Sequence, residues 1–207
     1  MEQLSFGFRE ETPAKFERLF FACQTDGGAS LRVHRFAKKF LFENGLWAKP
    51  LRDDRLHVSI HHVADRKRLR KDEVFASQQA GAKVSMEAFD IDFAFIETFE
   101  AHPARRGESP RYPLVLRAGE GEICHLHRQL GDRMRENWLR AGDVFVPHMT
   151  LAYLSEPVLR RAITPIRVPI RDFALIHSRV GLTEYRTLGR WPLHGPEGGS
   201  AALALAA

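Results

Sequence analysis

The chain has 207 residues, 44% of them hydrophobic, which is enough apolar material for a globular domain with a substantial core. No apolar run reaches the roughly 18 residues of a membrane span, and residues 1–11 lack the basic-then-apolar order of a signal peptide. Cys23 and Cys124 are too few for a secreted disulfide framework, so we expect reduced thiols and a cytoplasmic protein.

The formal net charge of +5 favours anionic partners without identifying one. Positive residues gather at 66–71, 105–111 and 160–161. Each cluster alone is typical of a solvated helix face or loop. Together they would allow a polyanion to approach by electrostatic attraction.

The first part of the chain predicts a strand, a helix and a second strand. The apolar residues 18–23 end at a Gly-Gly loop and predict a buried strand. Ser30 can cap a helix whose apolar positions follow helical spacing up to Asn44-Gly45. Residues 56–63 return to period two and predict the second strand.

The middle of the chain predicts a helix at 66–80 and two strands at 84–89 and 92–99, turning near Asp90. Residues 101–110 contain three prolines or glycines among basic residues and predict a loop. This loop either borders a cleft or divides two lobes.

The second half repeats the order of the first. Residues 113–116, 120–140 and 144–154 predict strand, helix and strand, and two more strands are expected at 168–176 and 179–188. The two strand-helix-strand units therefore indicate an internal duplication.

We expect one bilobed domain over residues 1–195, with duplicated units around 18–63 and 113–154. Residues 196–207 are rich in glycine and alanine and predict a flexible tail.

One four-residue pattern closes each unit: His57-Val58-Ser59-Ile60 and His148-Met149-Thr150-Leu151. Because strand side chains alternate faces, the histidine and the hydroxyl residue point one way and the apolar residues point to the core. A single such motif is equally well explained by a half-buried strand whose histidine donates to a backbone carbonyl. Its recurrence at the same place in both units favours a functional role.

The paired motifs suit in-line displacement at phosphorus. If the two halves pack about a pseudo-twofold axis, His57 and His148 flank one bound group. One imidazole can then take a proton from the attacking oxygen while the other protonates the departing oxygen. Ser59 and Thr150 can hold the non-bridging oxygens. The scheme requires no metal or other cofactor.

These motifs resemble the signature of the two-histidine (2H) phosphoesterase superfamily, and the sequence is similar to its RNA 2′,3′-cyclic phosphodiesterase and 2′-5′ RNA ligase branch, the LigT-like proteins. The likeness runs in order from about residue 18 to residue 193 and includes residues 18–22, 145–152 and 173–193. It implies an α+β fold of two pseudo-symmetric lobes, with antiparallel sheets lining a central groove and helices outside.

The resemblance also implies an activity. The catalytic pair would be His57 and His148, the substrate a 2′,3′-cyclic phosphate on an RNA end or a small cyclic nucleotide, and 2′-5′ ligation the reverse reaction. By analogy, His148 is the base that activates water and His57 is the acid. We expect a monomer that needs no cofactor and no membrane.

Further substrate contacts follow from the family's closing hairpin, which borders the groove and here contains Arg179 and Tyr185. His61 shares strand parity with His57 and Ser59, so a place in the groove and a place on the surface both stay open for it. His62 is expected to face the other way.

The sequence departs from the branch at two points. His61-His62-Val63 replaces a Phe-Leu-Gly-like turn after the first motif, and Tyr153 stands where an arginine often follows the second. These positions leave the substrate open.

Two other interpretations compete with this one. Three histidines at 57–62, or Cys124 with His125 and His127, are poor metal-ligand sets, because their spacing on a strand or a helix does not converge. A nucleotide- or RNA-binding module with little turnover is the stronger rival, since some members of the superfamily bind nucleotides without rapid catalysis.

Overall fold

The computed structural model describes residues 16–101, 110–182 and 184–194. The tail expected at 196–207 and most of the loop expected at 101–110 lie outside them. Within the described ranges the elements are β1 (Phe16–Gln24), α1 (Gly27–Glu43), η1 (Asp53–Arg55), β2 (His57–Arg66), α2 (Lys71–Ala82), β3 (Phe89–Thr98), β4 (Tyr112–Ala118), α3 (Glu122–Glu136), β5 (His148–Leu154), β6 (Arg161–Ile170), β7 (Asp172–Val180) and β8 (Glu184–Pro192).

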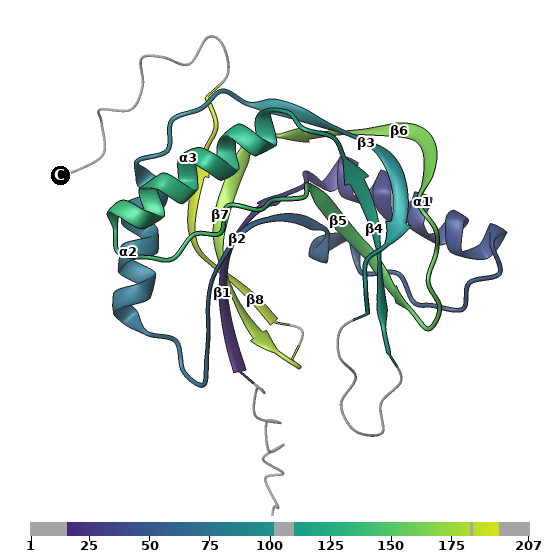
Figure 1. Ribbon diagram of the computed structural model, residues 1–207, viewed down its shortest axis with the longest axis horizontal. Coiled ribbons are helices and arrows are strands. Elements are labelled where there is room, and N and C mark those ends of the chain that lie inside the picture. Colours follow the sequence, from purple (N-terminus) through teal and green to yellow (C-terminus); the bar gives the residue numbers. More distant parts are fainter. Residues whose placement is uncertain (1–15, 102–109, 183, 195–207) are drawn as a thin grey trace, which may run out of the picture.

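Two antiparallel sheets form the body of the protein. One has the strand order β2-β1-β7-β8 and the other β5-β4-β3-β6. Figure 1 shows the two sheets curving around a common centre, with the helices on their outer sides. The expected α+β architecture of two lobes is confirmed, with β1-α1-β2 and β4-α3-β5 as corresponding units.

Helices α1 and α3 each pack partly against the sheet of the other strand-helix-strand unit. α1 contacts β5 and β6, and α3 contacts β2, β3 and α2 (Figure 1). The cap of α1 differs from the prediction: Asp26, not Ser30, precedes the helix and accepts a hydrogen bond from the Ala29 amide at 2.6 Å. The predicted end of α1 at Asn44 is confirmed.

The hairpin expected near Asp90 is wrong, because β3 runs straight through that residue. Phe89, Ile91 and Phe93 are buried, while the aspartates between them face solvent. Asp92 pairs with Arg167 at 3.0 Å on the neighbouring strand β6, so the alternation belongs to one long strand.

The strand expected at 168–176 is instead two strands in different sheets. β6 ends at Ile170 and β7 begins at Asp172, so Arg171 lies where the chain crosses from one sheet to the other. The adjacent charged residues Arg171 and Asp172 interrupt the apolar alternation here, but the local pattern does not say that the chain changes sheets.

A shared apolar core joins the lobes. In it, Phe21 of β1, Phe173 of β7 and Trp191 of β8 contact one another with ring centroids 5.2–6.3 Å apart. A Cβ atom on Gly189 would lie 2.5 Å from the Trp191 ring, and one on Gly81 would lie 2.6 Å away. Because glycine has no side chain, these two positions leave room for the Trp191 indole on the core side of β1 and β7. The opposite side of these two strands carries residues that line the groove.

Among the described residues, none of the helices is both long and apolar enough to cross a bilayer.

Candidate active site

Each motif strand carries a bulge directly after its hydroxyl residue. In the pairing of β1 with β2 the register shifts so that Ser59 and His61 face consecutive partners, which leaves Ile60 as the extra residue. In the pairing of β4 with β5 the same happens after Thr150, with Leu151 as the extra residue. The duplication thus extends to the irregularities of the two strands.

A cavity of about 440 Å³ opens between the lobes, and residues of both motifs line it. His57 and Ser59 come from β2, and Thr150 comes from β5 on the opposite sheet. His148 precedes Thr150 by two residues on β5 but is not itself among the cavity-lining residues; it is half-buried, with its ring 4.7 Å from that of Phe99. The remaining cavity-lining residues lie on β1, β2, β5, β7, β8 and nearby loops: Arg18, Phe20, Leu51, Arg55, His62, Tyr153, Ser178, Arg179, Val180, Gly181 and Tyr185.

Both motif histidines are oriented in the same way. Nδ1 of His57 donates to the carbonyl of Arg55 at 2.8 Å, and Nδ1 of His148 donates to the carbonyl of Val146 at 2.7 Å. A carbonyl can only accept, so each ring carries its Nδ1 proton when neutral. Nε2 of each imidazole is then the atom that can accept or deliver a proton.

Burial lowers the pKa of both imidazoles, and the carbonyl hydrogen bonds partly offset this by stabilising the protonated rings. The charges of Arg55 and His148 lower the pKa of His57 further, and Arg117 does the same to His148. Neutral imidazole, the form that acts as a base, is thus favoured near pH 7.

The two hairpin residues expected to contact substrate line the cavity. The Tyr185 ring lies 5.8 Å from the rings of His57 and Phe20, and the Arg55 guanidinium stacks over it at 3.5 Å. Arg179 also lines the cavity and forms an ion pair with Glu184 at 3.0 Å. Cations and an aromatic face therefore adjoin the His57 side of the cavity.

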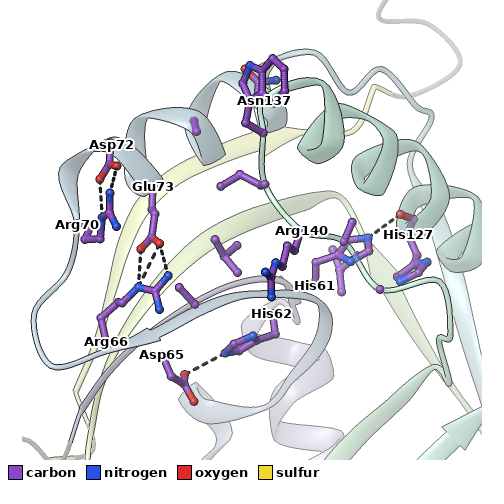
Figure 2. A pocket seen from close by; sticks show the side chains of 18 of the residues that line it. His61, His62, Asp65, Arg66, Arg70, Asp72, Glu73, His127, Asn137 and Arg140 are labelled. Carbon is purple, nitrogen blue, oxygen red and sulfur yellow. Dashed lines mark hydrogen bonds and ion pairs between the residues drawn. The ribbon is translucent and has the colours of Figure 1, made fainter.

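The expectation that His61 shares the orientation of His57 and Ser59 is wrong, because the Ile60 bulge reverses the strand alternation. His61 is only 4% exposed, and its Nε2 donates to the carbonyl of His127 on α3 at 2.8 Å. Figure 2 shows this bond at the wall of a second cavity, which shares His62 with the first. His61 therefore does not line the cavity that holds the motif residues, and its predicted contact with substrate is wrong.

The same bulges bring two other residues to the cavity. His62 and Tyr153 each follow their motif histidine by five positions, and both line the active-site cavity. His62 was expected to face away from the groove, but its side chain lines the cavity. It pairs with Asp65 at 3.0 Å (Figure 2), and Asp65 in turn forms an ion pair with Arg18. The two departures from the family pattern thus occupy equivalent groove positions.

Within the described residues, no group of three or more histidine, cysteine or acidic side chains is arranged to hold a metal ion. His125 and His127 diverge as expected: His125 is exposed near Glu122, whereas His127 is buried.

Solved structures share this fold. TT0787 of Thermus thermophilus is 20% identical with a TM-score of 0.64, and the match covers 86% of this chain and 99% of that one. E. coli LigT in apo form is 22% identical with a TM-score of 0.61, covering 86% and 98%. E. coli LigT complexed with 3′-AMP is 20% identical with a TM-score of 0.58, covering 87% and 99%.

The chain therefore has the α+β fold of these LigT-like structures, as the sequence resemblance predicted. No protein-family model matches the chain, and no curated protein matches it by sequence.

Proposed function

We propose that this protein is a phosphodiesterase of the 2H superfamily that hydrolyses a 2′,3′-cyclic phosphate on an RNA end or a small nucleotide, without a metal ion. The supporting observation is the matched geometry of His57 and His148. Two imidazoles on opposite sheets are each fixed through Nδ1 and each keep Nε2 for proton transfer. A purely structural pair of histidines would not need the same orientation twice.

The reaction needs two proton transfers, one from the attacking water to a base and one from an acid to the departing ribose oxygen. His148 takes a proton from water through Nε2 as the water oxygen bonds to phosphorus. His57 gives its Nε2 proton to the ribose oxygen as the bond from phosphorus to that oxygen breaks. The cyclic diester becomes a 2′- or 3′-phosphate monoester, and the two histidines regain their starting protonation by exchange with solvent. Ligation to a 2′-5′ linkage opens the cyclic phosphate in the same way, with the 5′-hydroxyl of a second ribose giving its proton to His148 in place of water, and the reversed path cleaves that linkage to the cyclic phosphate and the free hydroxyl.

The other cavity residues suit a nucleotide phosphate. Ser59 and Thr150 lie beside the two histidines on their strands and can donate to non-bridging oxygens. Arg55, Arg179 and Tyr185 supply positive charge and a ring on which a base can stack. E. coli LigT, which shares the fold, was crystallised with 3′-AMP, a nucleoside monophosphate of the kind this reaction releases. Site of action in the cytoplasm and a monomeric state belong to the same proposal.

The test is a panel of nucleoside 2′,3′-cyclic phosphates, short RNAs ending in a cyclic phosphate, and 2′-5′ linked oligomers, with and without chelator. We expect a 2′- or 3′-monophosphate product, chelator-resistant turnover, and a loss of about 10²–10⁴-fold for His57→Ala or His148→Ala. Saturable binding without product would support the binding-module alternative. Activity that disappears with chelator and returns with zinc would contradict the metal-free mechanism.

A further inference from the structure

Three aromatic rings stack in a column that joins the two motif strands outside the active-site cavity. His61 of β2 stacks on His127 of α3 with ring centroids 4.0 Å apart and planes 22° apart. His127 stacks on Phe145, which lies just before β5, at 4.4 Å and 7°. We call these three residues the ring column. Near-parallel contact with both neighbours makes the His127 ring the link between the two strands.

The ring column reaches His148 through one peptide unit. Phe145 is followed by Val146, whose carbonyl accepts the Nδ1 proton of His148 at 2.7 Å. At the other end, His61 donates through Nε2 to the backbone carbonyl of His127 at 2.8 Å. Helix α3 is thereby bound to β2 by its backbone and to the segment before β5 by a side chain.

The column is closely packed. His61 and His127 are 4% and 5% exposed, and both contribute to the wall of the second cavity in Figure 2. Gly131 lies one turn after His127 on α3, and a Cβ atom there would come within 3.1 Å of His61 Nε2. The helix thus leaves only enough room for the His61 ring at this point.

The column is built for uncharged rings. Burial is the main cause that lowers the pKa of His61, and the hydrogen bond to the His127 carbonyl partly offsets it. Burial, the neighbouring His61 and Arg135 together lower the pKa of His127 to about 4, with Asp143 acting in the opposite direction on both rings. Arg128 adds to the effect on the pKa of His127. At neutral pH both imidazoles are therefore neutral and can stack without electrostatic repulsion.

We propose that His127 is a positioning residue of the active site: its ring holds Phe145 in place, and with it the Val146 carbonyl that orients His148. The kinetic part of this inference rests on the proposed function. His57 takes its orientation from the Arg55 carbonyl, which the column does not touch. Loss of the His127 ring should therefore disturb one catalytic imidazole and spare the other.

The experiment follows the titration of both motif histidines by NMR in the full chain, alongside kcat and KM. In His127→Ala the pKa of His148 should fall, because the carbonyl bond that raises it is loosened, while the pKa of His57 should change far less, since its own bond to the Arg55 carbonyl is kept. We expect kcat to fall by about 10–100-fold, with KM near the wild-type value, because a small misplacement of a reacting group has effects of this size. His127→Phe restores a stacking ring and should return both the pKa of His148 and kcat toward their wild-type values.

The matched control is His125→Ala, on the same helix but exposed, which should change neither titration. If His127→Ala does not fold, Phe145→Leu removes the outer ring of the column and should give the same selective shift of His148. An unchanged titration of His148 in a folded variant, or equal shifts of both histidines, would overturn the inference. The titrations need no substrate, so they decide this inference even if no cyclic phosphate is hydrolysed.

Discussion

The pH dependence of catalysis follows from the environment of the two motif histidines. Each has a pKa below its ordinary value of about 6.5, mainly because of burial. In-line transfer needs one imidazole neutral and the other protonated. A plot of kcat/KM against pH should therefore be bell-shaped, with apparent pKa values that belong to the pair.

The lowered pKa values of the two histidines also set the position and the slopes of this bell-shaped pH profile. Since both values lie below about 6.5, the maximum should lie on the acidic side of pH 6.5. Above the higher value, the required singly protonated form falls close to tenfold per pH unit. Between about pH 6.5 and pH 8.5 kcat/KM should thus fall by about 100-fold.

The assay is the initial rate of hydrolysis of a nucleoside 2′,3′-cyclic phosphate at low substrate concentration, from about pH 4.5 to pH 9. His57→Ala should remove the alkaline limb, because that limb reports loss of the acid's proton. His148→Ala should remove the acidic limb, which reports protonation of the base. A wild-type profile that stays flat up to about pH 8.5 would refute the reasoning, since no protonated imidazole would then be needed.

Three further outcomes are expected. Ser59→Ala and Thr150→Val should each lower kcat by about 10²–10³-fold with unchanged thermal stability, measured by steady-state kinetics and calorimetry; a loss of stability without a loss of kcat would contradict the phosphate-binding role. Tyr153→Phe should alter KM for different cyclic nucleotides unequally, as an assay of the substrate panel would show, whereas a uniform change in KM would remove Tyr153 from substrate discrimination. Gly189→Ala should lower the free energy of unfolding in urea by about 1–3 kcal/mol, because the new methyl group would press on Trp191; an unchanged midpoint would show that the ring can move aside.

Much of the site could be predicted because the motifs combine two strong signals. The spacing of His57 and Ser59, repeated at His148 and Thr150, follows strand alternation over a stretch where no bulge intervenes. The fold class followed from the order of the elements and the family likeness. These predictions needed only local periodicity and its recurrence.

The remaining errors arise where pairing between distant segments overrides local pattern. The bulge at Ile60 depends on how β2 pairs with β1, and it sends His61 to α3 and His62 to the cavity. The junction at Arg171 likewise depends on which sheet each neighbouring strand joins. Period-two alternation alone cannot predict either event, because the partner and the register of a strand are set by segments distant in the sequence.

The central claim is that His57 and His148 act as an acid and base pair, and a change of leaving group tests it most directly. A 4-nitrophenyl phosphodiester of a 2′-deoxynucleoside releases an anion that needs little protonation, so it bypasses the acid but still requires the base.

The measurement is kcat/KM of wild type, His57→Ala and His148→Ala on this ester and on the matching 2′,3′-cyclic phosphate. We predict that His57→Ala loses about 10²–10⁴-fold on the cyclic phosphate but recovers most of its activity on the ester, while His148→Ala is impaired on both. Equal losses for both variants on both substrates, or no loss for either, would contradict the division of roles between the two histidines.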